Sequence, residues 1–414
     1  MSAPTQISEL LDRHRSGFTL AQPFYTDPAV FEEDLERIFY RTWLFAGHEC
    51  QIPQPGDYFT FDVGRAALII VRGDDGKVRA FSNSCRHRGS RICTEHSGRV
   101  GKFACPYHNW VYERNGRLAA AKWMGDNFDR NNHSLLSAHV EVLQGLIFVC
   151  LAATPPSFER ARQDIELRIR PHGMDRVRIC HVEEHVIHAN WKVIVENNRE
   201  CYHCPSGHPE YCKVNYDLGM PGDGRPNDAY ERHLAEKSAI WRAQGLEPSA
   251  INFPDGEWYR CARMPLRPGC LTESMDGQQV APLLGDLKSP DAGGVRLIAL
   301  PHAWFHINSD YANSTQLIPV GPELTRSRIA WFVRENAREG VDFQTHRVVD
   351  YWKITTEQDW KLSEINHQGI RSLQYKPGPL SPLTESGVGT FHEWYLRQLR
   401  GEPVEVTCRA AAAG

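Results

Sequence analysis

The sequence predicts an α+β protein of two domains, a small antiparallel β domain followed by a larger domain in which helices and strands mix. Residues 41–152 contain short alternating segments separated by turn residues, which is typical of antiparallel strands. Residues 153–157 include two prolines and have the composition of a linker. Helical and extended patterns then mix from residue 153 to residue 405. With 414 residues, 41% of them hydrophobic, the chain is long enough to bury two cores.

Residues 1–40 are expected to form a helical segment that packs on the second domain. Asp27 is a capping residue, and Pro28 suits the first turn of a helix. An amphipathic helix is therefore predicted over residues 27–39, with one apolar stripe made of Phe31, Leu35, Ile38 and Phe39. At the other end of the chain, the Ala-rich residues 406–414 are predicted to form a flexible tail.

The first domain shows the alternation of half-buried strands. Residues 58–63 alternate between apolar and polar side chains, and residues 67–72 form an apolar run. The Gly-Asp-Asp-Gly segment at 73–76 predicts a tight turn into a strand at 78–81. The pattern continues to about Val149, so we expect a series of short antiparallel strands.

The second domain combines both patterns. A strand is predicted over residues 181–189 and a helix from Val195 to about Cys204. A long helix is predicted from about Asp342 to Ser372, on the apolar spacing of Val348, Tyr351, Trp352, Leu362 and Ile365.

Composition excludes several classes of protein. The formal net charge is −4 and there is no long Lys/Arg run, so nothing indicates binding to nucleic acid or to an anionic membrane. No apolar run reaches the roughly 18 residues of a membrane-spanning helix, and the start is polar, so we expect a cytoplasmic protein. The twelve cysteines, without a secretory segment, favour metal ligation and buried thiols over a disulfide framework.

A first metal-ligand motif lies in the β domain, where Cys85 and His87 form Cys-x-His and Cys105 and His108 form Cys-x-x-His. Zinc fingers usually pair Cys with Cys and His with His along the chain. Here each loop offers one of each, which suits a 2Fe–2S cluster with both cysteines on one iron and both histidines on the other. A zinc site remains the alternative. Cys93 has no matching partner and is expected to be a buried thiol.

A second motif lies in the larger domain, where His203 and His208 are five residues apart. The Pro-Ser-Gly segment at 205–207 is expected to end a helix between them so that both imidazoles converge. Two histidines and one carboxylate make a facial triad for Fe(II) with open positions for O₂. Asp359, on the predicted long helix, is the best candidate carboxylate, and Glu357 is the second choice.

With both motifs in view, the sequence resembles the Rieske non-haem iron oxygenases, in their oxygenase (alpha) subunit. The loops at 83–90 and 105–112 match the cluster loops of that family closely, and the similarity runs from about Phe18 to Tyr395. The resemblance implies a Rieske domain followed by a catalytic domain of the helix-grip type, with a 2Fe–2S cluster and a mononuclear Fe(II). It also favours Asp359 as the carboxylate ligand of that iron, because similar oxygenases supply theirs at this position.

The resemblance also assigns roles to two further residues. Glu200, three residues before His203, is similar in position to an acid that links a cluster histidine of a neighbouring subunit to an iron ligand. This implies a homotrimer in which electrons pass between subunits, from His108 of one to His203 or His208 of the next. Asn197, one turn earlier, is expected to lie near the iron.

The bridging acid indicates a branch of the family. Most members have Asp there, whereas Glu200 looks like the branch that acts on quaternary ammonium compounds such as glycine betaine and stachydrine; further matching segments are residues 263–266, 275–277, 301–306 and 339–342. The family commonly has an acid just before the ligand Asp. Gln358 stands there in this chain, so the hydrogen bonding of that ligand is expected to differ.

A quaternary ammonium group cannot hydrogen-bond through its nitrogen, so aromatic faces are expected to hold it by cation–π attraction. Five aromatic side chains are candidates for this cage: Trp258, Tyr259, Trp304, Phe305 and Tyr311. Arg263 or His302 is the candidate partner for a substrate carboxylate.

The resemblance implies a monooxygenase that removes an N-methyl group as formaldehyde, with O₂ as co-substrate. A separate flavin and iron–sulfur reductase is expected to deliver electrons from NAD(P)H to the Rieske cluster. Other interpretations are a Rieske oxygenase acting on an aromatic acid or another ring, an electron carrier of the ferredoxin class, and a zinc-binding interaction module.

Overall fold

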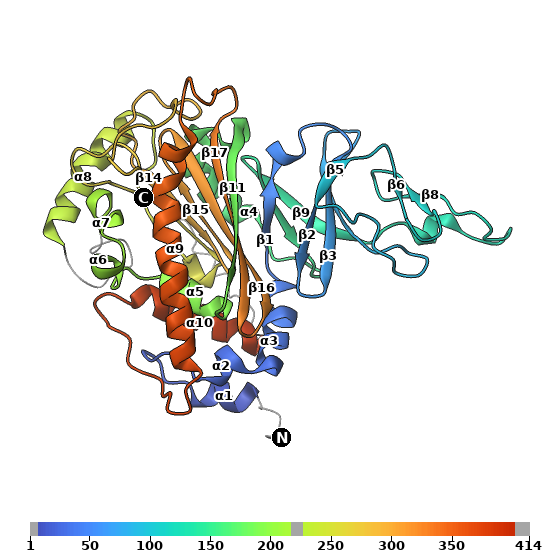
Figure 1. Cartoon of the computed structure of the whole chain (residues 1–414), viewed down its shortest axis with the longest axis horizontal. Helices are drawn as coiled ribbons and strands as arrows, with labels where there is room; N and C mark the ends of the chain where they lie inside the picture. Colours follow the sequence, from blue (N-terminus) through green and yellow to red (C-terminus); the bar gives the residue numbers. More distant parts are fainter. Residues whose placement is uncertain (1–6, 217–226, 402–414) are drawn as a thin grey trace, which may run out of the picture.

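The computed structural model describes residues 7–216 and 227–401, and its fold is α+β as predicted (Figure 1). Two seven-stranded sheets and one three-stranded sheet organise these residues. The smaller β part extends to the right in Figure 1, away from the larger part. Among the described residues, no helix is both long and apolar enough to cross a bilayer. The predicted tail, residues 406–414, lies outside the described residues.

The first sheet is antiparallel and has the order β1-β10-β9-β4-β3-β2-β5. Its strands are β1 (Leu44–His48), β2 (Asp57–Val63), β3 (Ala66–Arg72), β4 (Val78–Ser82), β5 (Ser97–Arg99), β9 (Ser137–Leu143) and β10 (Leu146–Cys150). The outer end carries the sheet of β6 (Phe103–Ala104), β7 (Val111–Tyr112) and β8 (Leu118–Ala120). The predicted turn after β3 is confirmed, because the Gly73 N–H donates to the Lys77 carbonyl at 2.9 Å.

Strand β3 separates two apolar cores. Leu68 and Ile70 belong to the large core shared with the second domain. Ile69 and Val71 belong to a smaller core at the outer end, which also contains both cysteines of the first metal motif. Because successive side chains of a strand point to opposite faces, one apolar run serves both cores.

The second domain is built on the antiparallel sheet β11-β17-β16-β15-β14-β13-β12. Its strands are β11 (Val177–Ile187), β12 (Ile251–Asn252), β13 (Tyr259–Met264), β14 (Gly294–Ala299), β15 (Ala303–Ile307), β16 (Tyr311–Gly321) and β17 (Leu324–Arg334). The long helix α9 (Thr345–Ile370) lies across this sheet in Figure 1, which is the helix-grip arrangement. The other helices are α4 (Glu159–Ile169), α5 (Trp191–Asn198), α6 (Cys204–Gly207), α7 (Tyr211–Val214), α8 (Asp228–Ala243) and α10 (Ser386–Arg400).

Two element predictions in this domain are confirmed and one is corrected. The strand predicted at 181–189 is part of β11, and the predicted long helix is α9, although its Ile365 is 54% exposed rather than buried. The helix predicted from Val195 to Cys204 is wrong in its bounds. It begins earlier because Asn190 caps it, its side chain accepting the Lys192 N–H at 3.0 Å, and it ends at Asn198.

The N-terminal segment contacts the second domain through a buried charge. It comprises α1 (Ile7–Arg13), α2 (Pro23–Thr26), α3 (Pro28–Asp34) and a π-helical turn (Leu35–Phe39), so the helix predicted over residues 27–39 is confirmed. Asp34 is fully buried, forms an ion pair with Lys192 of α5, and accepts hydrogen bonds from Trp191 Nε1 at 3.0 Å and Tyr395 Oη at 2.7 Å. Burial raises the pKa of Asp34 and lowers that of Lys192.

We expect Lys192→Met to destabilise the protein by about 3 to 5 kcal/mol, because it leaves the Asp34 carboxylate buried without its cation. The measurement is the free energy of unfolding from a urea titration. The double variant Asp34→Asn/Lys192→Met should recover much of the loss, since no buried charge remains. Lys361→Met, at an exposed position of α9, is the control and should change little. A double variant as unstable as the single one would contradict this account.

Candidate metal centres and active-site pocket

The four residues of the first motif converge at the outer end of the β domain. The His87 and His108 rings lie 4.6 Å apart between centroids, and Cys85 and Cys105 are both 3% exposed. Tight turns shape the loops, since the Gly89 N–H donates to the Cys85 carbonyl at 2.9 Å and the Asn109 N–H to the Cys105 carbonyl at 3.0 Å. The two imidazoles thus lie side by side, and the Cys85 and Cys105 side chains interact with each other in the same small core.

The chemistry of these donors fits a metal cluster. Burial raises the pKa of the Cys105 thiol, but hydrogen bonds from the backbone N–H groups of Tyr107 and His108 outweigh it and lower the pKa overall, which favours the ligating thiolate. His87 Nδ1 is buried and has no hydrogen-bond partner among the described residues. Its ring stacks on Trp110 at 4.9 Å, which fixes the direction of that free nitrogen. His108, by contrast, is exposed.

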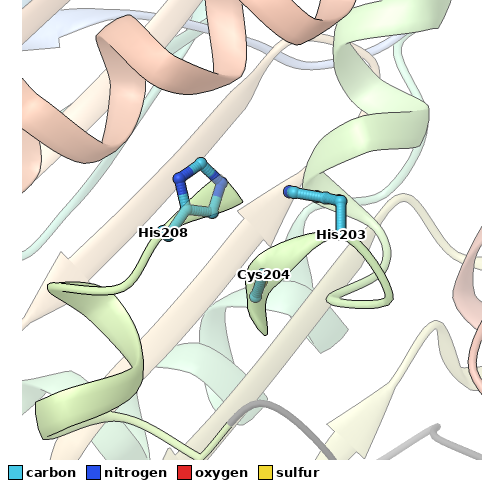
Figure 2. Close-up of side chains that lie close together, drawn as sticks. All are labelled: His203, Cys204 and His208. Atoms are coloured by element: carbon cyan, nitrogen blue, oxygen red, sulfur yellow. The ribbon is translucent and has the colours of Figure 1, made fainter. Parts of the chain in front are cut away.

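The second motif converges beside α9. His203 precedes α6 and His208 follows it (Figure 2). Asp359 Oδ1 lies 2.8 Å from His208 Nε2 and 3.2 Å from His203 Nε2. Asn197 Nδ2, at the end of α5, is 3.4 Å from His203 Nε2. Two imidazoles and one carboxylate therefore present their ligand atoms to one point, the donor set of a facial triad.

Each histidine is oriented from its other ring nitrogen. His203 Nδ1 donates to Glu200 Oε1 at 2.5 Å, and His208 Nδ1 donates to Gln358 Oε1 at 2.8 Å. Such contacts fix the tautomer and leave Nε2 available for a metal. Gln358, which stands where the family commonly has an acid, therefore orients His208 through an amide oxygen in place of a carboxylate.

The charges of the site are coupled. Burial lowers the pKa of His203, but the hydrogen bonds to Asp359 and Glu200 outweigh burial and raise it to about 10. The pKa of His208 is also raised, against burial, by Asp359. Burial raises the pKa of Asp359, but the hydrogen bonds to the two histidines outweigh burial and lower it overall. The cluster therefore favours an ionised carboxylate, which can ligate a cation.

Two details of the predicted site are corrected. Residues 205–207 do end a helix between the histidines, but this helix is the separate α6 (Cys204–Gly207) and not the predicted continuation of α5, which ends at Asn198. Glu357 lies on another side of α9, where its side chain is 49% exposed and lies 3.8 Å from Lys353. It is therefore set aside as the carboxylate candidate.

A pocket opens beside the triad. Asn197, Glu200, His203, His208 and Asp359 line it together with Tyr211, Arg260, Met264, Arg296, Leu297, Ile298, Trp304, Phe305, His306, Trp352 and Thr355. Two of the seven predicted substrate residues, Trp304 and Phe305, are among these. The Phe305 ring also packs edge-to-face with Phe45, with the centroids 4.7 Å apart.

The other five predicted substrate residues do not line this pocket, because other contacts hold them. Trp258 packs against Phe148 and Phe158. The remaining four are engaged by hydrogen bonds: Tyr259 Oη with Asp164, Arg263 with the Ala292 and Arg168 carbonyls, His302 with the Leu317 carbonyl, and Tyr311 Oη with the Glu273 carbonyl. We therefore withdraw these five from the proposed substrate pocket.

Sequence reasoning missed three lining residues that bear on substrate binding, namely Tyr211, Arg260 and Trp352. Tyr259 and Arg263 share one face of β13, toward α4, whereas Arg260 points to the other face, as period-two alternation requires. Trp352 was detectable, since it lies seven residues before Asp359 and so on the same face of α9. Tyr211 was detectable as well, because it follows the ligand His208 by only three residues.

One further correction concerns the cysteines. Buried thiols were expected outside the cluster loops, but Cys201 and Cys204 form a disulfide. Both line the pocket and both flank His203. The predicted free thiol at Cys93 is present and buried.

The fold and the site define the class of protein. Residues 42–128 match the family model described as "Rieske [2Fe-2S] domain". Residues 169–401 match the family model described as "Ring hydroxylating alpha subunit (catalytic domain)". The chain belongs to this family of Rieske non-haem iron oxygenases, whose members carry a 2Fe–2S cluster and a mononuclear iron. This decides against the zinc module and against a simple electron carrier.

Among its relatives is the glycine betaine monooxygenase oxygenase subunit of Chromohalobacter salexigens, 39% identical over 94% of this chain and 87% of that protein. The protein of the same name from Pseudomonas aeruginosa strain UCBPP-PA14 is 37% identical over 95% of this chain and 91% of its own. A solved structure of a quaternary ammonium Rieske monooxygenase covers 96% of this chain and 100% of that one with a TM-score of 0.71 and 21% identity. That likeness shows the fold.

Proposed function

We propose that this chain is the oxygenase component of a monooxygenase that removes an N-methyl group from a betaine-type quaternary ammonium compound. The observation that carries the proposal is the pocket itself: the His203, His208 and Asp359 triad meets a wall that includes four aromatic side chains and two arginines. The names of the two glycine betaine monooxygenase relatives support the substrate class.

The proposed ligands follow from the two donor sets. Cys85, Cys105, His87 and His108 would hold the cluster, and the triad would hold the iron. When bound, the iron supplies the open coordination positions at which dioxygen is activated. Hydroxylation of an N-methyl C–H bond consumes one O₂, two electrons and two protons, and gives a carbinolamine and water. The carbinolamine then releases formaldehyde and the demethylated amine.

The chain's own residues position this chemistry. Tyr211, Trp304 and Trp352 line the pocket and supply aromatic rings that would attract a cation unable to donate a hydrogen bond. Trp352 is held by its Nε1–H, which donates to Glu273 Oε2 at 3.1 Å. Leu297 and Ile298 add apolar surface that excludes water from the reacting methyl group. Glu200 and Gln358 keep the Nδ1 protons of the two histidines in place.

The arrangement of one chain also supports a proposed homotrimer. Figure 1 shows β6 and β8, which belong to the small sheet beside the cluster loops, at one end of the molecule, and α6, which lies between the two triad histidines, toward the other end. Electrons would therefore reach the iron from the cluster of a neighbouring subunit, passing through Glu200. The initial donor would be a flavin and iron–sulfur reductase that uses NAD(P)H, and we propose a cytoplasmic location.

The test is formaldehyde release, with a surrogate reductase, across glycine betaine, stachydrine, carnitine, choline and an aromatic acid. We expect release from a betaine, coupled to O₂ uptake. Hydroxylation of the aromatic acid without formaldehyde from any betaine would contradict the proposal.

Arg260 is the proposed partner of the substrate carboxylate, in place of Arg263 and His302. It lies on the pocket face of β13 in one cross-strand row with Ile298 and Trp304. We expect Arg260→Met to raise the KM for glycine betaine by about 10- to 100-fold, the value of a charged hydrogen bond. Binding of choline, which has no carboxylate, should change little. Equal losses for both ligands would contradict the assignment.

A further inference from the structure

The Cys201–Cys204 disulfide lies at the metal triad, and the sequence between its two cysteines contains His203. Cys204 is the first residue of α6, between the two ligand histidines (Figure 2). Its Sγ and one ring nitrogen from each of His203 and His208 all lie within 4.8 Å of one another. A sulfur atom thus stands where it could become a ligand.

The disulfide removes that sulfur from the donor set. Metals in proteins bind the cysteine thiolate, whereas a sulfur atom in a disulfide carries no charge. While the bond is closed, the site offers two imidazoles and the Asp359 carboxylate, a set that suits Fe(II) with open positions. Once it opens, a thiolate joins two imidazoles, a set that suits zinc.

We propose that the Cys201–Cys204 bond determines which metal this site accepts, with the closed bond favouring Fe(II) and the open pair favouring Zn²⁺. Selection of this kind is needed, because a site of fixed nitrogen, oxygen and sulfur ligands binds Zn²⁺ more tightly than Fe²⁺. Excluding the thiolate from the ligand set therefore favours Fe(II) at this site. The inference concerns the metal and holds whichever substrate is demethylated.

Geometry and access support the switch. Ligand atoms of a tetrahedral zinc with one sulfur lie about 3.6 Å apart, as its bond lengths require. Because the Cys204 sulfur already lies within 4.8 Å of a ring nitrogen of each histidine, a shift of about 1 Å brings it into that range once the bond to Cys201 is broken. Both cysteines are less than 10% exposed but line the open pocket, through which a small dithiol can reach them.

The opening step is a thiol–disulfide exchange. One dithiol molecule transfers two electrons and two protons to the Cys201–Cys204 bond, which becomes two thiols, and the dithiol closes into its own disulfide. Zinc binding then displaces the Cys204 thiol proton. In reducing compartments, disulfides mostly serve catalysis or redox sensing, and this pair fits that use.

The test reads the zinc ligands directly. The full-length protein with its cluster in place is stripped of mononuclear iron, given Zn²⁺ and measured by X-ray absorption at the zinc edge, where the cluster is silent. We expect a zinc–sulfur distance of about 2.3 Å in the dithiol-treated wild type and in Cys201→Ser, which leaves the Cys204 thiol free. The untreated wild type and the matched control Cys204→Ser should show nitrogen and oxygen ligands alone.

Two results would overturn the inference. One is a purely nitrogen and oxygen shell in Cys201→Ser with its cluster spectrum intact, and the other is a zinc–sulfur path in Cys204→Ser. Alkylation and mass spectrometry, without added dithiol, should leave Cys201 and Cys204 unmodified in the wild type. Labelling of both would also refute the closed state. None of these measurements depends on formaldehyde release, so the proposed reaction is judged separately.

Discussion

Asp359→Ala is expected to lose the mononuclear iron and all formaldehyde production while it retains the Rieske cluster. Asp359 is the single carboxylate that lies within hydrogen-bonding distance of both His203 Nε2 and His208 Nε2 among the described residues. Without it, two neutral imidazoles are left, and an oxygen-preferring Fe(II) loses its only charged ligand. Iron analysis should therefore fall by about one iron per chain, while the two irons of the cluster stay.

Glu357→Ala is the matched control, because Glu357 belongs to the same helix but is exposed beside Lys353. It should keep its iron and its turnover. Cluster absorption, recorded for both variants, reports whether the first domain has folded. If Asp359→Ala kept a full complement of iron, the carboxylate of the triad would have to come from elsewhere.

Glu200→Gln is expected to lower coupled turnover by about 10- to 100-fold while both metal centres stay bound. Glu200 Oε1 accepts the His203 Nδ1–H at 2.5 Å within its own chain. A glutamine keeps the size of the side chain but removes the charge that holds the imidazole and, as proposed, connects it to the next subunit. The losses should therefore appear in kcat, with iron content and cluster spectrum unchanged.

A single-turnover experiment separates the bridge from a general defect. The reduced cluster should be reoxidised slowly by O₂ and substrate in Glu200→Gln, and at the normal rate in Glu393→Gln, which alters an exposed acid of α10. Normal product formation in Glu200→Gln would refute its role in electron transfer.

The metal motifs were predictable from sequence because their geometry is local. In each motif, two ligands lie within five residues of one another, so the spacing alone brings them together once a turn forms. Asp359 lies 151 residues from His208, and here the prediction used the resemblance to a family rather than the spacing. Glu200 and Gln358, which are close in sequence to triad residues, each hydrogen-bond one of the two histidines.

The substrate pocket was much less predictable, because it depends on which face of a strand each side chain takes. Tyr259 and Arg263 are the right kinds of residue on the wrong face of β13, and their neighbour Arg260 faces the pocket. A shift of one residue reverses every side chain of a strand, so composition alone cannot choose between them. The disulfide was missed for a similar reason, since pairing requires the chain to bend back between Cys201 and Cys204.

Strand β3, with Leu68 and Ile70 on one side and Ile69 and Val71 on the other, acts as a partition between two separately packed compartments. The cluster and its loops are confined to the smaller one. Oxidative damage that destroys the cluster should accordingly melt that compartment as its own cooperative unit, while the larger compartment keeps its native hydrogen-exchange protection. We then expect that iron and sulfide added back to the damaged protein restore the cluster spectrum without prior unfolding of the larger compartment.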